Sequence, residues 1–412
     1  MTYLEFLRAN RRWLAGGFLL TLSSSFGQTF FISLFGGDIR GEFSLSHGDF
    51  GTLYAIATLA SAFVIIWLGK LADHMRIAPL SIATIAGLAA ACAGMGAVQS
   101  TWMLVLVLFG LRLFGQGMLS HIPLTAMGRW FSAQRGRAVA IATLGFAFGE
   151  AVSPILAVSL SASIGWRQAW FVSAVVLLVL FAPVIWGLFS VRRVKSGAPI
   201  QLTGTGEGDP QHSWTRTQML KDPLFYALLP GLLTPAFIIT GVFFHQVHLV
   251  ESKGWSLGLF AGAYPLFAGI SVLTGLGTGF AIDRWSASSL LPYYLLPLAG
   301  GLMVLAGFDG SWTGYCFMAL AGFTVGISAT ILGAIWADVY GTAHLGAIRA
   351  LGASLMAFST ALSPGTMGWL IDAKVILETQ FFWMAVYIFV VSACSLLLAR
   401  ALHLRQMAPL RA

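Results

Sequence analysis

The sequence predicts an all-α membrane protein whose twelve transmembrane helices form two repeats of six. Three observations predict this fold: the composition, the number of long apolar stretches, and a charged loop that recurs 210 residues later. Of the 412 residues, 58% are hydrophobic and 9% are charged, whereas a soluble protein has about 25% charged residues. So much apolar surface requires lipid as the solvent.

A transmembrane helix needs about 20 predominantly apolar residues. Between the sixth and seventh apolar stretches lies a segment rich in Gly, Ser, Thr and charge, which is typical of a flexible linker. We expect an N-terminal six-helix bundle at 1–190, a cytoplasmic linker at 191–222 and a C-terminal six-helix bundle at 223–412. The twelve predicted spans are 13–36, 48–68, 79–98, 102–127, 138–162, 168–190, 223–250, 257–281, 287–307, 312–338, 346–370 and 380–400.

Basic residues are unevenly distributed across the predicted membrane. With the N-terminus in the cytoplasm, 18 of the 23 Lys and Arg residues fall in cytoplasmic segments, four fall on the opposite side, and Arg112 lies inside a span. This bias follows the positive-inside rule and accounts for the net charge of +8, so nucleic-acid binding is not expected. We expect a multi-pass protein of a bacterial inner membrane with both termini in the cytoplasm.

The charged loop at 69–76 has a weaker copy at 279–284. Further matches at the same offset of 210 residues occur in the fifth span of each half, where the Ser-Pro pair at 153–154 corresponds to the pair at 363–364. One offset that serves two separate regions indicates parallel repeats of six spans. This is how one large class of secondary transporters is built.

With these motifs, the sequence resembles the major facilitator superfamily over essentially its whole length. The family's loop after helix 2 reads roughly G-x-x-x-D-R-x-G-R-R, and here His74 replaces the Arg. The resemblance implies that Asp73 caps the start of helix 11 and helps to latch the outward-open state. The candidate residues for this conformational gate are Gly69, Asp73, Arg76, Asp283 and Arg284.

Helix 4 contains a run at 110–117 that resembles the family's R-x-x-x-G-x-G element, with Arg112 as its arginine. Gln116, beside the glycines of this element, is a further candidate for the substrate site. The run at 129–154, followed by Gly-Trp-Arg at 165–167, is most similar to the monocarboxylate and oxalate/formate porters. Those porters tend to carry a basic residue in helix 8, and span 257–281 has none. The resemblance implies a small organic anion as substrate.

Two charged residues lie near the predicted midplane. Arg112 is about ten residues into its span, or about 15 Å deep, and Glu150 reaches a similar depth from the other side. Charges are costly there, so both are candidate functional residues. We expect them to face each other, with Arg112 stabilising an anionic substrate or the ionised Glu150, and with Glu150 carrying a coupling proton. A static ion pair between helices is the alternative.

Other polar residues are candidates for the substrate site. Gln28 lies near the middle of the first span, where it either lines a cavity or packs helices together. Tyr54 either lines an aromatic cavity or belongs to the core. His245 and His248 share one helix face and are expected to line an outer vestibule. A metal site is the alternative, but two histidines without a third ligand are a weak signal for one, and no metal or cofactor is expected.

Together these features predict a secondary active transporter, not an enzyme, that works by alternating access. We expect proton-coupled symport of a small, monocarboxylate-like organic anion, with protons, substrate and the lipid bilayer as partners and a monomer as the working unit. Two alternatives remain: efflux of drugs or amphiphilic metabolites, and uptake of another small metabolite or vitamin. No G-x-x-x-x-G-K-[ST] motif supports ATP as the energy source.

Overall fold

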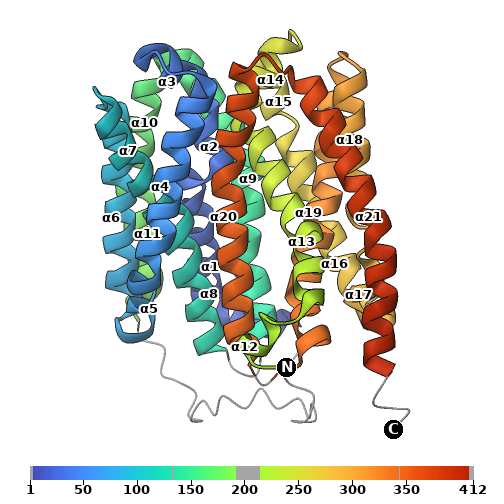
Figure 1. Ribbon diagram of the computed structural model, residues 1–412. Coiled ribbons are helices and arrows are strands. Elements are labelled where there is room, and N and C mark those ends of the chain that lie inside the picture. The colour runs from blue at the N-terminus through green and yellow to red at the C-terminus, as the bar shows by residue number, and fades with distance from the viewer. Residues whose placement is uncertain (1–2, 132–133, 192–213, 343, 408–412) are drawn as a thin grey trace. The chain divides into compact units, whose positions relative to one another are not determined.

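The computed structural model describes residues 3–131, 134–191, 214–342 and 344–407, and within these ranges the secondary structure is helical, without strands. Figure 1 shows the arrangement of the helices. Most of the predicted linker lies outside the described residues, as do the predicted cytoplasmic charges Arg192, Arg193, Lys195 and Arg411. The prediction of an all-α fold is confirmed.

Among the residues that the structure describes, fifteen helical segments correspond to the first six predicted spans. Several spans consist of more than one segment, because short 3₁₀ or π stretches interrupt the α-helix. We call the chain from α1 to α3 helix 1, the chain from α7 to α8 helix 4, and α9 helix 5. The segments are α1 (Tyr3–Ser23), η1 (Ser24–Gly27), α2 (Thr29–Ile32), η2 (Ser33–Phe35), α3 (Gly36–Phe43), α4 (His47–Leu68), α5 (Leu71–His74), α6 (Ile77–Gly96), α7 (Thr101–Gly110), η3 (Leu111–Met118), α8 (Leu119–Trp130), α9 (Arg135–Ile164), α10 (Trp166–Val176), η5 (Leu177–Phe181) and α11 (Ala182–Phe189).

The remaining segments begin with a short helix that follows the predicted linker. We call α13 with α14 helix 7, and α15 with α16 helix 8. The segments are α12 (Arg216–Met219), α13 (Pro223–Phe244), α14 (Gln246–Ser252), α15 (Leu257–Ala261), α16 (Tyr264–Trp285), α17 (Ala287–Leu290), α18 (Leu296–Gly307), α19 (Trp312–Tyr340), α20 (Leu345–Asp372) and α21 (Leu377–Met407).

Ten helices in the described part of the chain are long and apolar enough to cross a membrane. Helix 1 makes an eleventh if Leu4–Gly27 and Thr29–Phe43, which meet at a bend of 44°, count as one span. The predicted ninth span, 287–307, is divided into α17 and the short apolar helix α18. The predicted seventh span, 223–250, is likewise interrupted, at His245.

The helix bounds reproduce the sequence repeat. Corresponding helices begin or end 210 residues apart at four places: His47 with Leu257, Ile77 with Ala287, Trp130 with Tyr340, and Arg135 with Leu345. The two copies of the charged loop nevertheless differ. In the first copy α4 ends at Leu68 and a separate short helix follows, whereas in the second copy α16 runs unbroken to Trp285.

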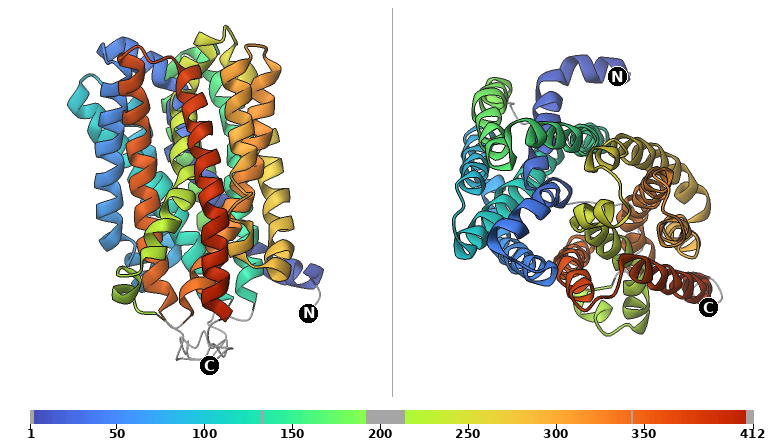
Figure 2. Two further views of the ribbon diagram at one scale, coloured as in Figure 1. Left: turned by 45° about the vertical axis from the view of Figure 1, so that its right-hand side comes forward. Right: turned by 90° about the horizontal axis from the view of Figure 1, so that it is seen from above.

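The chain divides into two compact units. Unit 1 comprises Met1–Ala198, Phe243–Pro265 and Pro364–Asp372, and unit 2 comprises Pro199–Val242, Leu266–Ser363 and Ala373–Ala412. Unit 1 therefore holds the first-repeat helices together with short segments of the second repeat. In Figures 1 and 2 the first-repeat helices, coloured blue to green, lie alongside one another. The domain boundaries expected from the sequence stay a prediction.

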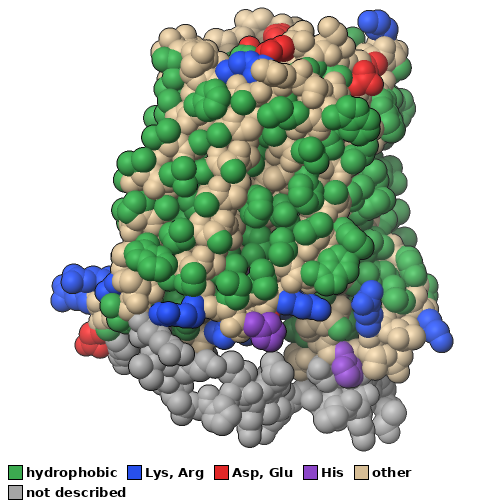
Figure 3. All heavy atoms as spheres, turned by 90° about the vertical axis from the view of Figure 1, so that its left-hand side faces the viewer, with side chains coloured by type: hydrophobic (Ala, Val, Ile, Leu, Met, Phe, Trp, Pro, Cys, Tyr) green, Lys and Arg blue, Asp and Glu red, His purple; other side chains and the backbone are tan. Residues whose placement is uncertain are grey.

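The face that α6 and α7 help to form has the surface of a membrane-spanning protein. Hydrophobic side chains cover its middle, and Lys and Arg side chains lie near its ends, more of them toward the end that carries the 69–76 loop (Figure 3). This band matches the apolar helices and places the chain in a bilayer as a multi-pass integral protein.

Helices 1 and 5 pack unusually closely in unit 1. A Cβ atom added at Gly145 would overlap the Phe18 carbonyl oxygen and the Thr21 hydroxyl. The Thr21 hydroxyl donates a hydrogen bond to the Ala142 carbonyl across this contact, at 2.5 Å. Such small-residue contacts let two backbones approach each other in a membrane, where the hydrophobic effect does not drive helices together.

We expect Gly145→Ala to lower the stability of the protein by about 1–3 kcal/mol, because the added methyl group forces helix 5 away from a backbone atom that cannot move aside. Gly136, on the same helix, has open space around its Cβ position. Gly136→Ala is therefore the matched control, and it should be neutral or stabilise by up to about 1 kcal/mol. Thermal unfolding of the detergent-purified protein measures both, and equal effects would contradict the close contact.

Candidate functional site

The site is built around a break in helix 1. Gln28 has extended backbone angles, φ −84° and ψ 154°, between the 3₁₀ turn at 24–27 and α2. The residues before the break are serines, and the hydroxyls of Ser23 and Ser24 donate to carbonyls three residues earlier on the same helix. Such local hydrogen bonds offer the backbone an alternative to the regular helix. The break leaves backbone groups of helix 1 without their usual helical partners.

Arg112 supplies one of the missing partners. It is 1% exposed, and its Nη1 donates to the Gly27 carbonyl oxygen at 3.1 Å. Its guanidinium also lies 5.1 Å from the centre of the Tyr54 ring, a cation–π distance. The Tyr54 hydroxyl in turn shares a hydrogen bond of 2.7 Å with the Thr29 hydroxyl. The Nε–H of Arg112 is buried and has no hydrogen-bond partner among the described residues.

The backbone around Arg112 makes this contact possible. Residues Leu111–Met118 of helix 4 form a π-helix, which is wider than an α-helix and is frequent at functional sites. Gly27 and Gly115 meet there, and a Cβ atom on either glycine would overlap the other. Close approach of the two helices therefore depends on both glycines.

A polar cavity of about 350 Å³ lies beside the break, also within unit 1. Helices 1, 4 and 5 provide its walls, and its side chains offer one carboxyl, two amides, two hydroxyls and two aromatic rings. The lining residues are Ser25, Gln28, Phe30, Gln116, Ser120, Phe146 and Glu150. Such a set can hold a small molecule by hydrogen bonds and aromatic contact.

Glu150 is the only acidic side chain among these lining residues. Its position follows from the close packing of helices 1 and 5, because a Cβ atom at the preceding Gly149 would overlap the Ser25 hydroxyl. Within the described part of the chain, the Glu150 carboxylate forms no hydrogen bond or ion pair. The static ion pair with Arg112, which was the alternative to a functional role, is not formed among the described residues, since Arg112 contacts Gly27 and Tyr54 instead.

The structure brings only some of the predicted substrate residues together. Gln28, Gln116 and Glu150 line the cavity, whereas Arg112 and Tyr54 do not, although they contact the same break in helix 1. Tyr54 is fully buried, and its ring also packs against Phe244 at 4.8 Å. Their functional roles stay predictions.

The two predicted histidines lie away from the cavity. His245 is 4% exposed, and its Nε2 lies 2.9 Å from the Pro364 carbonyl oxygen. Because a carbonyl can only accept, Nε2 carries the hydrogen. The ring of His248 lies 4.4 Å from that of His47, centre to centre, and His47 Nε2 lies 3.0 Å from an Arg40 nitrogen. The structure thus places His47 and Arg40 beside His248, and the sequence did not single out either residue as a site candidate.

The predicted gate residues lie at helix ends. Gly69 follows α4, with its N–H bonded to the Ile65 carbonyl, and Arg76 precedes α6. Asp73 is exposed, and its carboxylate forms no hydrogen bond or ion pair with the described residues of unit 1. In unit 2, Asp283 and Arg284 are exposed near the end of α16, where Arg284 lies over a tryptophan ring. Among the described residues, these side chains form no latch contact within either unit.

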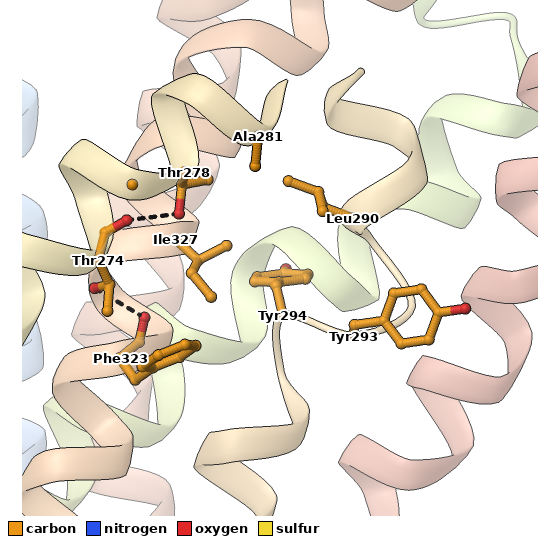
Figure 4. A pocket seen from close by; sticks show the side chains of 9 residues that line it. Thr274, Thr278, Ala281, Leu290, Tyr293, Tyr294, Phe323 and Ile327 are labelled. Carbon is orange, nitrogen blue, oxygen red and sulfur yellow. Dashed lines mark hydrogen bonds between the residues drawn. The ribbon is translucent and has the colours of Figure 1, made fainter. Parts of the chain in front are cut away.

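Unit 2 contains a second cavity, of about 380 Å³, between α16, α19 and the segment before α18 (Figure 4). Its lining is apolar and aromatic, with no charged residue among the described residues that form it. Three hydroxyls of its lining bond to the backbone: Thr274 to the Ile270 carbonyl, Thr278 to the Thr274 carbonyl and Tyr294 to the Gly231 carbonyl. The hydroxyl of Tyr293 points away from the cavity (Figure 4). This cavity therefore lacks the free polar groups that the cavity beside Glu150 provides.

Comparison with known proteins is consistent with this architecture. The Major Facilitator Superfamily matches residues 17–364 of the chain. Two curated relatives are an MFS transporter, asaE, of Aspergillus flavus, 25% identical over 205 residues, and an MFS-type efflux pump of Mycolicibacterium smegmatis, 28% identical over 194 residues. These alignments cover 47% and 46% of this chain and 43% of each relative, so the chain spans less than half the length of the relatives it matches.

Two kinds of solved structure share the fold. A bacterial homologue of the human lysosomal transporter Spinster, inward-facing and occupied, has a TM-score of 0.70 at 15% identity, over 94% of this chain and 96% of that one. A mutant of the nucleoside transporter NupG has a TM-score of 0.62 at 14% identity, over 95% of this chain and 99% of that one. At such identities these likenesses show the fold alone.

The family match covers most of the chain, and the chain belongs to the Major Facilitator Superfamily. The members of this superfamily are transporters and not enzymes, and the apolar helices make this chain a multi-pass membrane protein. The expectation of this superfamily is confirmed. The expected monocarboxylate and oxalate/formate branch stays a prediction, as does the coupling ion.

We expect Arg112→Met to destabilise the protein by about 1.5–3 kcal/mol, because the Gly27 carbonyl loses a charged donor inside the protein. Arg112→Lys keeps the charge without the planar group that contacts both the carbonyl and Tyr54, so an intermediate effect is expected. Arg8→Met, at an exposed position of α1, is the control. Thermal unfolding and hydrogen exchange at residues 24–32 measure the effect, and an Arg112→Met variant as stable as wild type would contradict this structural role.

Proposed function

We propose that this transporter is proton-coupled, works by alternating access, and binds its substrate in the cavity beside Glu150. The carrying observation is a carboxyl group without a fixed partner among the described residues, placed in a polar cavity between membrane-spanning helices. Ionisable residues inside a membrane protein are costly to keep and commonly serve as proton relays. A carboxyl that no cation holds ionised is free to gain and lose its proton during transport.

The cavity lining supports a particular class of substrate. Its polar groups are one carboxyl, the amides of Gln28 and Gln116 and two serine hydroxyls, and no basic side chain lines it. The two phenylalanines, Phe30 and Phe146, add aromatic surface. This chemistry suits a small amphiphilic molecule that is cationic or rich in hydrogen-bond donors. Efflux is the favoured direction, because one relative is an MFS-type efflux pump.

A second candidate function is uptake of a small, monocarboxylate-like organic anion in symport with protons. The favouring observation is Arg112, a buried cation whose Nε–H has no partner among the described residues. Movement of helix 1 would release the Gly27 carbonyl and leave the guanidinium for an anion. The similarity of the run at 129–154 to monocarboxylate porters also supports it. The remaining alternative is uptake of another small metabolite or vitamin. Such a substrate would bind in the same cavity and would not need a particular charge.

The topology proposed for either function has both termini in the cytoplasm of a bacterial inner membrane, because basic residues predominate in the segments on that side. The working unit is proposed to be a monomer. The loop with Gly69, Asp73 and Arg76, together with Asp283 and Arg284, is proposed as the cytoplasmic gate.

In that role, Asp73→Asn should slow turnover more than it weakens substrate binding.

A thermal-shift panel of organic cations, organic anions and neutral metabolites separates the two candidates. A ligand that binds the folded state stabilises it by about 2.7 kcal/mol at a concentration 100 times its Kd. The melting temperature therefore rises. We expect amphiphilic cations to stabilise the wild-type protein and to lose most of this effect in Glu150→Gln. Stabilisation by monocarboxylates that Arg112→Lys weakens and Glu150→Gln does not would favour the anion transporter instead.

We expect Glu150→Gln to abolish accumulation driven by a pH gradient while leaving substrate exchange measurable, because the variant cannot carry the coupling proton. The measurement is transport into proteoliposomes, with and without a pH gradient, of a ligand identified by the panel. Glu5→Gln, which changes an exposed acid near the N-terminus, serves as the control and should behave as wild type. Unchanged gradient-driven accumulation in Glu150→Gln would remove the coupling role of this residue.

A further inference from the structure

Gln246 is a fully buried amide outside the cavity lining. It is the first residue of α14, directly after the interruption of helix 7, and it belongs to unit 1. Its Nε2 donates to the Phe30 carbonyl oxygen at 2.9 Å and to the Ser33 hydroxyl at 2.7 Å, and its Oε1 accepts from the Tyr264 hydroxyl at 3.1 Å. One side chain thus joins helix 1, helix 7 and helix 8.

The partners of Gln246 form part of the cavity wall. Phe30 lines the cavity with its ring, and its carbonyl belongs to the four-residue helix α2 between the break at Gln28 and the 3₁₀ turn at 33–35. The backbone at 29–32 therefore forms only one short helical turn, which contributes few helical hydrogen bonds to fix its position. The Phe30 and Tyr264 rings lie 5.9 Å apart, so Gln246 fixes the backbone of one aromatic residue and the hydroxyl of its neighbour.

Tyr264 connects this cluster to the titratable group of the site. It is fully buried, and its ring lies 5.9 Å from that of Phe30, which lines the same cavity as Glu150. The short helix α15, just before Tyr264, packs against helix 5, which carries Glu150. We expect an ionised carboxylate in this cavity to compete with Gln246 for the hydroxyl hydrogen of Tyr264, because charged acceptors bind donors more strongly than amides do. A neutral carboxyl group competes less strongly with Gln246 for this hydrogen.

We propose that Gln246 is a positioning residue for transport, which ties the wall of the Glu150 cavity to the segment at 243–252. The charge on Glu150 and the packing of this segment against helix 1 then depend on each other through Tyr264 and Gln246. This inference rests on the proposed role of Glu150 in proton coupling. It adds a specific route by which a proton in the cavity alters the packing of helix 1 against residues 243–265 within unit 1.

Hydrogen exchange of the purified full-length protein tests the positioning role without a substrate. We expect Gln246→Leu to raise exchange of the backbone amides at 29–35 about tenfold, because the Phe30 carbonyl loses its buried donor. Gln380→Leu is the matched control, since Gln380 is 4% exposed and donates to the Val375 carbonyl within unit 2. Unchanged exchange at 29–35 in Gln246→Leu would overturn the proposal.

A double-mutant cycle tests the coupling that a purely structural role would not produce. At alkaline pH, where carboxylates are ionised, Glu150→Gln should slow exchange at 29–35 several-fold in the wild-type background and have no further effect in Gln246→Leu. The same comparison with Tyr264→Phe, which removes a single oxygen, covers the case in which Gln246→Leu does not fold. Equal effects of Glu150→Gln in all backgrounds would show that Gln246 is not the link.

The two proposals fail in different ways. Loss of the double-mutant coupling, with gradient-driven transport still dependent on Glu150, overturns the role of Gln246 alone. Retained coupling, with gradient-driven transport unaffected by Glu150→Gln, overturns the proton role and leaves Gln246 as a link between the cavity and helix packing.

Discussion

The need to satisfy backbone polar groups inside a bilayer is the constraint on which this site depends. A continuous transmembrane helix pairs its own carbonyls and amides, and a broken helix requires partners from elsewhere. Helix 1 is broken at Gln28, and two buried side chains from other helices bind carbonyls beside the break: Arg112 binds that of Gly27, and Gln246 binds that of Phe30. The break, its two partners and the polar cavity form one structure.

Glycines make this arrangement sterically possible. Gly27 and Gly115 bring helices 1 and 4 together, and Gly145 and Gly149 do the same for helices 1 and 5. The close contacts place Glu150 next to the break, with Ser25 and Gln28 as neighbours in the cavity lining. Packing attraction and hydrogen bonding hold such helices together in lipid, so each lost contact at these glycines directly weakens the frame of the site.

Apolar length and the repeat offset predicted the fold, because a helix in lipid must be about 20 residues long and a duplicated unit keeps its spacing. The same reasoning placed Arg112 and Glu150 near the midplane, which stays a prediction, and it could not give the direction in which their side chains point. A step of about 100° per residue holds for an α-helix, whereas residues 111–118 form a π-helix that turns the following residues away from that register. The break at Gln28 was also missed, although the preceding serines, which can bond to the backbone, were a signal for it. Gln246 could not be found from sequence, since its partners lie far from it along the chain.

The two repeats share helix bounds but differ at the positions of the charges. Arg112 corresponds to Gly322, which packs against the backbone of Phe267, and Glu150 corresponds to Thr360, whose hydroxyl bonds to its own helix. At Gly322 the second repeat is closely packed, whereas the first repeat has a polar cavity lined by Glu150. The cavity in unit 2 is apolar. Each charge inside a membrane protein has a large desolvation cost, so duplicating both charges would add that cost a second time. The presence of both charges in one repeat, on a scaffold that the other repeat shares, is consistent with that cost.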